Sequence, residues 1–279
     1  MSSLQERVEA LFAQGADVDR KAARACVKEL RDALSAGTVR SAEPDAASAS
    51  GWRVNTWVKR GILLAFRAGD IVEMDFGGGY LSDKDTLPLK GFTDAKGVRL
   101  VPGGSSVRDG VYVGRNVIFM PPMYVNIGAW IGDDSLIDSH ALVGSCAQIG
   151  SRVHLSAAAQ IGGVIEPVGA MPVIVEDDVM IGGNCGVYEG AVIKRRAVLA
   201  SGTVITRSTP VYDTVNGRII TAAADQPLVI PEGAVVVPGT RPIETGHGAE
   251  WRLSVAAPVI VKYRDKRTDA RTALEQWIR

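Results

Sequence analysis

The stretch that decides the fold runs from residue 125 to residue 155 and reads VNIGAWIGDDSLIDSHALVGSCAQIGSRVHL. Its large apolar residues stand six positions apart, a period that fits neither an amphipathic helix nor an alternating strand. The same spacing extends in both directions through Val101, Val107, Val113, Phe119, Val125, Ile131, Ile137, Val143, Ile149, Leu155 and Ile161. A second run, in a new register, covers Val175, Ile181, Val187, Ile193, Leu199, Ile205 and Val211.

Two further positions of the repeat show what the apolar residues do. The position four residues after each apolar one is usually small, as at Ala129 and Ala141, and the position directly after it is often Gly or acidic, as at Gly132 and Asp138. An inward apolar residue, a small corner residue and a tight turn describe one side of a three-sided coil. The repeat therefore predicts a parallel β-helix. The resemblance to hexapeptide-repeat proteins implies a left-handed coil, against the usual right-handed crossover rule.

Composition narrows the class of protein. The chain has 279 residues, 46% of them hydrophobic, which is enough for a sizeable core, and its formal net charge is zero. A neutral chain has no global field to attract nucleic acid or an anionic membrane, and no apolar run is long enough to span a bilayer. The first residues lack the pattern of a secretory signal, so we expect a cytoplasmic protein without nucleic-acid or membrane partners.

The cysteines and histidines give no sign of a metal. The three cysteines are odd in number and stand at no metal-ligand spacing, which favours a reducing compartment. Cys185 occupies a small corner position of the repeat, with thiol catalysis as the alternative. His140, His154 and His247 also lack ligand spacing, so we predict no metal.

The domain order follows from the position of the repeat. We predict an N-terminal helical or α+β domain over 1–100, the β-helix over 101–240, and a C-terminal strand and capping helix over 241–279. In the first domain, we expect helices over 4–36 that stop at Gly37, a loop over 41–50 and a helix over 51–67. We interpret Gly77–Gly79 as a flexible turn.

Two segments interrupt or follow the repeat. Ile161 and Val175 are fourteen residues apart, which is two more than two repeats, and the residues between them are rich in Gly and Pro. Residues 162–174 are therefore predicted to form an excursion loop that leaves the coil and returns. Asn216–Gly217 is a turn signal for a hairpin over 213–220, and the last helix is predicted over 268–278, where it would cap the open end of the coil.

Several motifs, some of them outside the repeat, resemble the tetrahydrodipicolinate N-succinyltransferase family, and the resemblance covers nearly the whole chain. They are RVNTWVK at 53–59, ILLAFR at 62–67, YVNIGA at 124–129, VGSCAQIG at 143–150, VHLS at 153–156, IGGVIEP at 161–167, VYD at 211–213 and VIVK at 259–262. The resemblance implies transfer of succinyl from succinyl-CoA to the amino group of L-2-amino-6-oxopimelate, in lysine and diaminopimelate synthesis. It also implies a homotrimer whose sites lie in the grooves between coils.

The resemblance assigns roles to two residues. Arg99, in GVRLVP at 97–102, matches an arginine that binds a substrate carboxylate, a task suited to a planar guanidinium. Asp138, in LIDS at 136–139, matches an aspartate that contacts the amino group and can act as base. From the repeat alone, each would be an ordinary residue, Arg99 at a domain join and Asp138 in a turn.

Four positions depart from the common family pattern. Gly186 stands where a glutamate is common, Asn184 replaces an arginine, His140 replaces a tryptophan, and Ala157–Ala158 replaces a pair of glycines. These changes put the acid/base partner and the acyl donor in doubt. His140 is a second predicted catalytic residue because its neutral imidazole can accept a proton, whereas His154 is expected to have a structural role.

The remaining expectations concern the acyl-CoA. The predicted CoA-binding residues are Ala157, Ala158, Gly162, Gly163, Lys194, Arg195 and Lys262, with solvated basic side chains as the alternative for the Lys194–Arg196 run. Two other functions stay open. One is an acetyl-CoA-dependent paralogue of the tabtoxin-biosynthesis type, which would act on the same or a related amino acid. The other is a non-catalytic trimeric scaffold, against which the presence of Arg99 and Asp138 argues.

Overall fold

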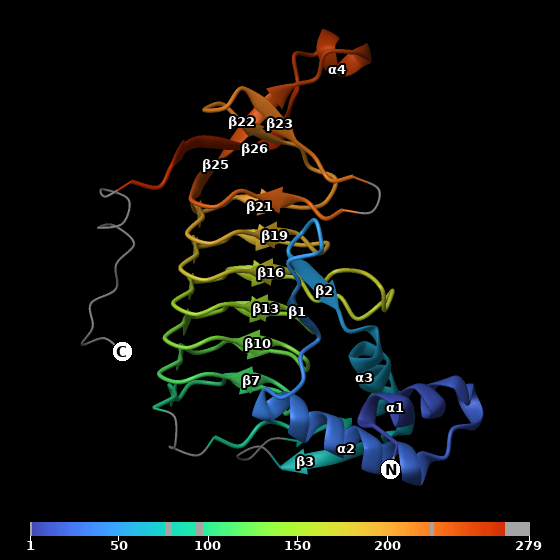
Figure 1. Ribbon diagram of the computed structural model, residues 1–279. Coiled ribbons are helices and arrows are strands. Elements are labelled where there is room, and N and C mark those ends of the chain that lie inside the picture. The colour runs from blue at the N-terminus through green and yellow to red at the C-terminus, as the bar shows by residue number, and fades with distance from the viewer. Residues whose placement is uncertain (1, 76–79, 93–96, 224–225, 266–279) are drawn as a thin grey trace.

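The computed structural model describes residues 2–75, 80–92, 97–223 and 226–265 of the chain. Short strands stack in register around a three-sided coil, which confirms the predicted parallel β-helix (Figure 1). Almost every strand of the coil has two residues, because the chain turns at each corner of the triangle. Equivalent strands of successive coils pair in parallel, as Ile131 with Ile149 and Ile137 with Leu155.

The three sides of the coil are named sheets A, B and C. Sheet A holds β5 (Arg99–Leu100), β8 (Ile118–Phe119), β11 (Leu136–Ile137), β14 (His154–Leu155), β17 (Met180–Ile181) and β20 (Val198–Leu199). Sheet B holds β6 (Ser106–Val107), β9 (Tyr124–Val125), β12 (Leu142–Val143), β15 (Gln160–Ile161), β18 (Gly186–Val187) and β21 (Val204–Ile205). Sheet C holds β7 (Tyr112–Val113), β10 (Trp130–Ile131), β13 (Gln148–Ile149), β16 (Ile174–Val175), β19 (Val192–Ile193) and β24 (Val229–Ile230). The chain passes from A to B to C, so the turns form A/B, B/C and C/A corners.

The apolar residues of the repeat fill the interior of the coil, as predicted. From Val107 to Ile205 each is the second residue of its strand and is buried in one continuous core. The small residues four positions later, such as Ala147 and Ala197, are also buried there because the corners leave little room. Burial of this kind is the main stabilising term for a repeat that cannot fold as a single unit.

The two ends of the predicted repeat differ from the expectation. Val101 does not continue the six-residue register, because Leu100 rather than Val101 pairs with Phe119. Val211 is buried but lies in β22 (Val211–Asp213), which pairs with β23 (Arg218–Ile220) and not with sheet C. The chain re-enters sheet C at β24. Periodicity alone could not show either change, since each keeps an apolar residue at the expected position.

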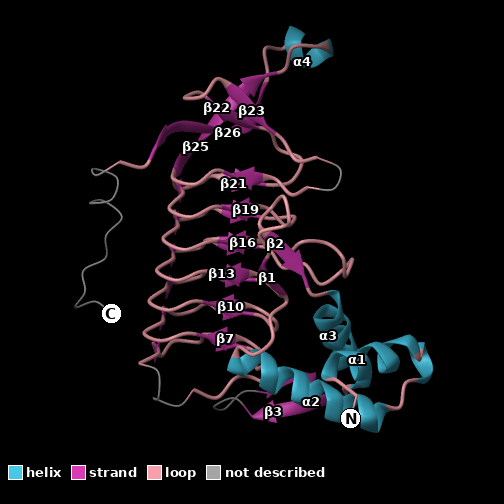
Figure 2. Cartoon of the chain, in the orientation of Figure 1, coloured by secondary structure: helices cyan, strands magenta, loops and turns pink. Residues whose placement is uncertain are grey.

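The N-terminal domain contains three helices near the start of the coil (Figure 2). Helix α1 (Leu4–Ala13) begins with a Ser3–Glu6 capping box, and α2 (Arg20–Ala36) ends at Gly37, whose φ of 79° is the left-handed conformation that glycine adopts readily. The predicted loop over 41–50 and helix over 51–67 need correction. They contain the antiparallel strands β1 (Ala42–Pro44) and β2 (Trp52–Val54), and α3 (Thr56–Ala68) starts only after them.

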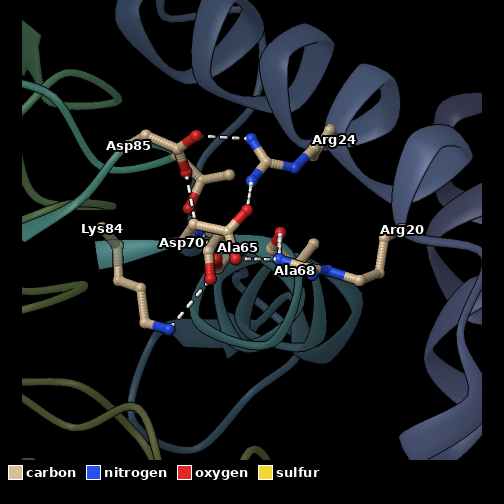
Figure 3. A network of polar contacts seen from close by, with 9 residues as sticks. Arg20, Arg24, Ala65, Ala68, Asp70, Lys84 and Asp85 are labelled. Carbon is tan, nitrogen blue, oxygen red and sulfur yellow. Dashed lines mark hydrogen bonds and ion pairs between the residues drawn. The ribbon is translucent and has the colours of Figure 1, made fainter. Parts of the chain in front are cut away.

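A network of charged groups ties α2 to the far end of α3 and to the hairpin of β3 (Ile71–Asp75) and β4 (Tyr80–Lys84). The Arg24 guanidinium donates to Asp85 at 2.6 Å and to Asp70 at 2.7 Å (Figure 3). Arg20 donates to the same Asp70 carboxylate and to the carbonyl of Ala68. One carboxylate that accepts from two arginines fixes how α2 crosses the end of α3.

The N-terminal domain covers only part of the coil. Trp52 packs with Ile174 and Val192 on the outer face of sheet C, while Ile127 and Cys146 at the B/C corner belong to the core of the helices. The outer faces of sheets A and B carry apolar side chains that remain at least partly exposed, such as the half-buried Leu136 and Met180 on A and the half-buried Leu142 and exposed Val204 on B.

The described C-terminal part is a strand pair and a short helix. Strand β25 (Ala234–Pro242) extends sheet A beside β20, and β26 (Ser254–Tyr263) pairs with β25 and β22. Helix α4 (Gly246–Glu250) lies at the tip. The predicted hairpin around Asn216–Gly217 is confirmed by the antiparallel β22–β23 pair, whereas the helix predicted over 268–278 lies outside the described residues. Among the described helices, none is long and apolar enough to cross a membrane.

Candidate active site at the A/B corner

The structure gathers four predicted site residues at one edge of the coil. Asp138 and His140 lie in the A/B turn between β11 and β12, and Ala157 and Ala158 lie in the next turn. The turns are joined by a hydrogen bond from the backbone N–H of Ala158 to the carbonyl of Ser139, at 2.8 Å. Stacked strands are about 4.8 Å apart, so these residues face one stretch of surface.

The same corner collects three of the family departures in a column. His140, Ala158 and Asn184 have φ of 61°, 58° and 55°, the left-handed conformation, and each is the third residue of its A/B turn. Asn tolerates this conformation well, whereas Ala adopts it at a cost of about 1 kcal/mol. A column of three such positions makes the departures neighbours in space, although 44 residues separate the first from the last.

Asp138 and His140 face different surroundings. The Asp138 carboxylate accepts a hydrogen bond from the backbone N–H of Ser139 at 2.7 Å, which orients it, and no other described group pairs with it. His140 is exposed and lines a hollow of about 440 Å³ on the outer face of sheet B, with Tyr124, Leu142 and Gln160. A carboxylate and an imidazole without ion-pair partners in the described chain are available to bind an amine and accept a proton.

Arg99 lies on sheet A, one of the two sheets that meet at the A/B corner. It is exposed at the first strand of sheet A and is in register with Ile118, which in turn pairs with Leu136, two residues before Asp138. Two strand spacings of about 4.8 Å separate their coils, a distance that an extended arginine side chain largely spans. Arg99 and Asp138 thus lie near the same edge of the coil, and their binding of one ligand stays a prediction.

Gly162 and Gly163 lie in a different hollow. They start the excursion loop at the B/C corner and line a cavity of about 830 Å³, together with Tyr188, Arg207 and other residues. The chain leaves the coil after Ile161 and returns at β16, which starts at Ile174. Lys59 of α3, which is fully buried, holds this loop because its ammonium donates to the carbonyl of Ala170 at 2.5 Å. Burial lowers the pKa of Lys59.

The other predicted CoA-binding residues are spread over the molecule. The Lys194 ammonium lies at the C/A corner and donates to Glu176 at 2.9 Å and to the carbonyl of Ser50 at 2.8 Å, so it ties the β1–β2 connection to the coil. Arg195 is exposed beside it, and Lys262 is exposed on β26 near Asp265. Within one protomer these side chains lie far from the A/B corner, and their role toward CoA stays a prediction.

The remaining sequence candidates have structural surroundings. Cys185 is buried in the core of the coil, where burial raises the pKa of its thiol, and its Sγ contacts the carbonyl of Ala200 at 3.1 Å. It fills the corner, as predicted. His154 is the outward residue of β14 on sheet A, and no group of His, Cys, Asp or Glu among the described residues is arranged to hold a metal.

Tyr188 is a residue that the sequence did not single out. It follows the inward Val187, at the position of the repeat that is often Gly or acidic, and this departure is the signal that could have found it. Its ring lies across two glycines: a Cβ on Gly186 would be 2.4 Å from Tyr188 Cε2, and a Cβ on Gly162 would be 2.9 Å from Cδ1. Gly186 therefore leaves room for an aromatic ring where the common family pattern has a glutamate.

Comparison with known proteins identifies the family. Residues 3–68 match the model described as the N-terminal part of tetrahydrodipicolinate N-succinyltransferase, and residues 172–207 match the hexapeptide repeat of succinyl-transferase. A protein named 2,3,4,5-tetrahydropyridine-2,6-dicarboxylate N-succinyltransferase from Polynucleobacter asymbioticus is 42% identical over 92% of this chain and 90% of its own length. A protein of that name from Idiomarina loihiensis is 37% identical over 100% of this chain and 99% of its own. The chain belongs to this N-succinyltransferase family.

Membership confirms two expectations at once. The three-sided coil is the left-handed parallel β-helix of the hexapeptide-repeat proteins, as the resemblance implied. The N-terminal domain is also that of the N-succinyltransferase family, which a repeat shared by many acyltransferases could not show alone. A hexapeptide-repeat acetyltransferase from Vibrio cholerae, solved with acetyl coenzyme A, has a TM-score of 0.35 and 16% identity, over 85% of this chain and 93% of its own. That likeness is too small to bear on the acyl donor.

Proposed function

We propose that this protein transfers an acyl group, in the first place succinyl, from a CoA thioester to the amino group of L-2-amino-6-oxopimelate. This acceptor is the ring-opened form of the 2,3,4,5-tetrahydropyridine-2,6-dicarboxylate named for the relatives. The observation that carries the proposal is about 40% identity to proteins of that name along more than nine tenths of the chain. Asp138 at the A/B corner supports it, since among the described groups its carboxylate accepts only the Ser139 N–H, and it lies in the same turn as His140, which lines the hollow.

The reaction makes three demands on the protein. The amine nitrogen attacks the thioester carbonyl carbon, the carbonyl π electrons move to oxygen, and the collapse of the resulting oxyanion expels the CoA thiolate. The amine proton must pass to a base, directly or through water, and the thiolate is protonated on release. The protein therefore needs a proton acceptor, a donor toward the carbonyl oxygen and groups that hold both reactants in line.

Residues of this chain match these demands in part. We assign a substrate carboxylate to Arg99, because a guanidinium binds a carboxylate through two parallel hydrogen bonds. We assign the ammonium and its proton to Asp138, with His140 as the second acceptor at the same corner. The acyl-CoA would lie along the outer face of sheet B, between the excursion loop with Gly162 and Gly163 and the corner with Ala157 and Ala158.

We propose a cytoplasmic homotrimer as the active form. Sheets A and B, whose outer faces carry partly exposed apolar side chains, meet at the A/B corner, so packing of one coil against the next would place that corner in an interfacial groove. Lys194, Arg195 and Lys262 would then act toward CoA only if a neighbouring protomer brings its cofactor to them. A non-catalytic scaffold fits less well, because it leaves the free Asp138 and His140 without a role.

Acetyl is the second donor to consider. The A/B turns at 120–123, 138–141, 156–159, 182–185 and 200–203 contain no Lys or Arg, so these turns themselves supply no cation to a succinyl carboxylate, and Arg99 is assigned to the amine substrate. An acetyl donor has no such charge and would suit a specialised paralogue.

Thiol release from succinyl-CoA and acetyl-CoA, with 2-amino-6-oxopimelate or 2-aminopimelate as acceptor, tests both statements. We expect acceptor-dependent release, with a preference for succinyl-CoA of more than about tenfold in kcat/KM, or roughly 1.4 kcal/mol. The reverse preference would assign the chain to acetyl transfer. No release from either donor would contradict the proposed function.

A further inference from the structure

Tyr188 lies between the two hollows that the proposed reaction must connect. The cavity with Gly162 and Gly163 has Tyr188 in its wall, and the hollow with His140 ends at Gln160. Gln160 is in register with Gly186, the glycine that the Tyr188 ring covers. An acyl-CoA that occupied both hollows would therefore lie against the Tyr188 side chain.

The orientation of the ring places its hydroxyl on this path. A Cβ on Gly186 would lie 2.4 Å from Cε2, 2.9 Å from Cζ and 3.0 Å from the hydroxyl oxygen of Tyr188. The hydroxyl end of the ring thus rests over Gly186, two residues after Asn184 of the A/B column, while the Cδ1 edge rests over Gly162. The absence of side chains at Gly186 and Gly162 leaves room for the ring in this position on the outer face of sheet B.

The hydroxyl is available for a ligand. Tyr188 is half-buried, and within the described chain no group forms a hydrogen bond with its oxygen. A phenol can donate one hydrogen bond and accept another. By contrast, Gln160 is already engaged, because its side-chain amide donates to the carbonyls of His140 at 3.1 Å and Ala158 at 3.2 Å.

We propose that the Tyr188 hydroxyl donates a hydrogen bond to the thioester carbonyl oxygen of the bound acyl-CoA. This inference rests on the proposed acyl transfer and names the donor that the reaction needs. As the amine attacks, the carbonyl oxygen gains the π electrons, and the hydrogen bond strengthens with the negative charge. The hydroxyl keeps its proton throughout, so Tyr188 stabilises the oxyanion and takes no part in the proton transfer from the amine.

Tyr188→Phe removes the hydroxyl and keeps the ring, so the cover over Gly186 stays in place. We expect kcat to fall about 100-fold, the size found when one oxyanion donor is lost, with the affinity for CoA by calorimetry changed less than about twofold. Tyr112→Phe is the matched control, because its ring stacks on Trp130 on sheet C, away from both hollows. That variant should keep the wild-type kcat.

A second variant tests the same hydrogen bond from the glycine side. Gly186→Ala would push the ring away, since its Cβ would lie 2.4 Å from Cε2. We expect a loss in kcat of similar size, and little further loss when both substitutions are combined, because each removes the same interaction. Additive losses, or a Tyr188→Phe enzyme with kcat within twofold of wild type, would overturn the role of Tyr188 and leave the acyl transfer intact. A wild-type protein that releases no thiol would overturn both.

Discussion

The A/B and C/A corners of the coil share a backbone conformation but differ in charge. Most turns at both corners have a left-handed third residue, such as His140 and Ala158 at one corner and Asp134 and Arg152 at the other. At the C/A corner, ion pairs link successive turns, for example Arg152 with Asp178 at 2.7 Å. The A/B turns contain a single carboxylate, one imidazole and no Lys or Arg.

This contrast separates the residues that build the coil from those that act. Charges at the C/A corner satisfy one another along the stack, as Arg115 with Asp133 and Lys194 with Glu176 also do. At the A/B corner, within the described residues, the Asp138 carboxylate has one backbone donor and no cation. The same turn therefore serves two purposes: paired charges stabilise one corner, and unpaired groups at the other remain free for a ligand.

We expect the largest effect on assembly and activity from a substitution on the outer face of sheet B, beside the A/B corner. Val204, 47% exposed on sheet B, should be covered by a neighbouring protomer if the trimer forms there. Val204→Arg would bury an unpaired charge in an interface of more than about 1,000 Å², so we expect monomers in light scattering and no measurable activity. Val215→Arg is the control, because Val215 is 52% exposed in the β22–β23 turn. A trimeric, active Val204→Arg protein would place the interface elsewhere.

Asp138→Asn tests the chemistry of the A/B corner directly. The amide keeps the shape of the turn and the acceptor for the Ser139 N–H but removes the charge, so we expect a normal trimer, an unchanged Tm and a rate at least about 100-fold lower. Asp133→Asn is the matched control, since Asp133 accepts the Arg115 N–H at 2.9 Å at the C/A corner. Full activity in Asp138→Asn would transfer the role of proton acceptor to His140.

The sequence predicted the coil because its repeat is a local rule: each strand contributes one inward residue and each corner one small one. It failed where a partner outside the repeat decides the register. Leu100, and not Val101, pairs with Phe119, and Val211 joins the C-terminal strands. Strands β1 and β2 were missed for a similar reason, since three-residue strands have too few positions to show alternation.

The candidate site was predictable only in part. Asp138 and Arg99 could be selected by resemblance, but the repeat gives no reason to prefer them over other turn or strand residues. Stacking alone shows that His140, Ala158 and Asn184 form one column. The role of Lys194 in holding the β1–β2 connection also depends on a contact 144 residues away in the chain, which no local pattern contains.

A smaller effect, on the affinity for the amine substrate, is expected when the arginine assigned to the substrate carboxylate is removed. Arg99→Ala should weaken binding of the amine substrate by about 2 kcal/mol, which corresponds to a KM or Kd raised roughly thirtyfold. The affinity for CoA should stay unchanged. Arg99 is exposed in the protomer, where an ion pair would contribute less than about 1 kcal/mol, so an effect of this size requires a groove that excludes water. Calorimetry with each substrate measures the two affinities, with Arg115→Ala at the C/A corner as control. An unchanged affinity for the amine would make Arg99 structural.

The smallest effect concerns stability beyond both corners, where the C-terminal strands extend sheet A. Burial raises the pKa of Asp213, but hydrogen bonds from Asn216, the Tyr263 hydroxyl at 2.8 Å and Arg218 outweigh it and lower the pKa to about 2. The unfolded carboxylate titrates near 3.9, so this stabilisation is complete above about pH 4 and is lost as the pH falls toward 2. The Tm of the wild type should therefore fall further between pH 6 and pH 3 than the Tm of Asp213→Asn. The control Asp32→Asn, at an exposed carboxylate, should show the same fall in Tm as the wild type. Equal losses of Tm for wild type and Asp213→Asn would show that acid unfolding starts elsewhere. The next candidates are the paired carboxylates of the C/A corner, such as Asp178, because Arg152 holds the pKa of Asp178 below its ordinary value.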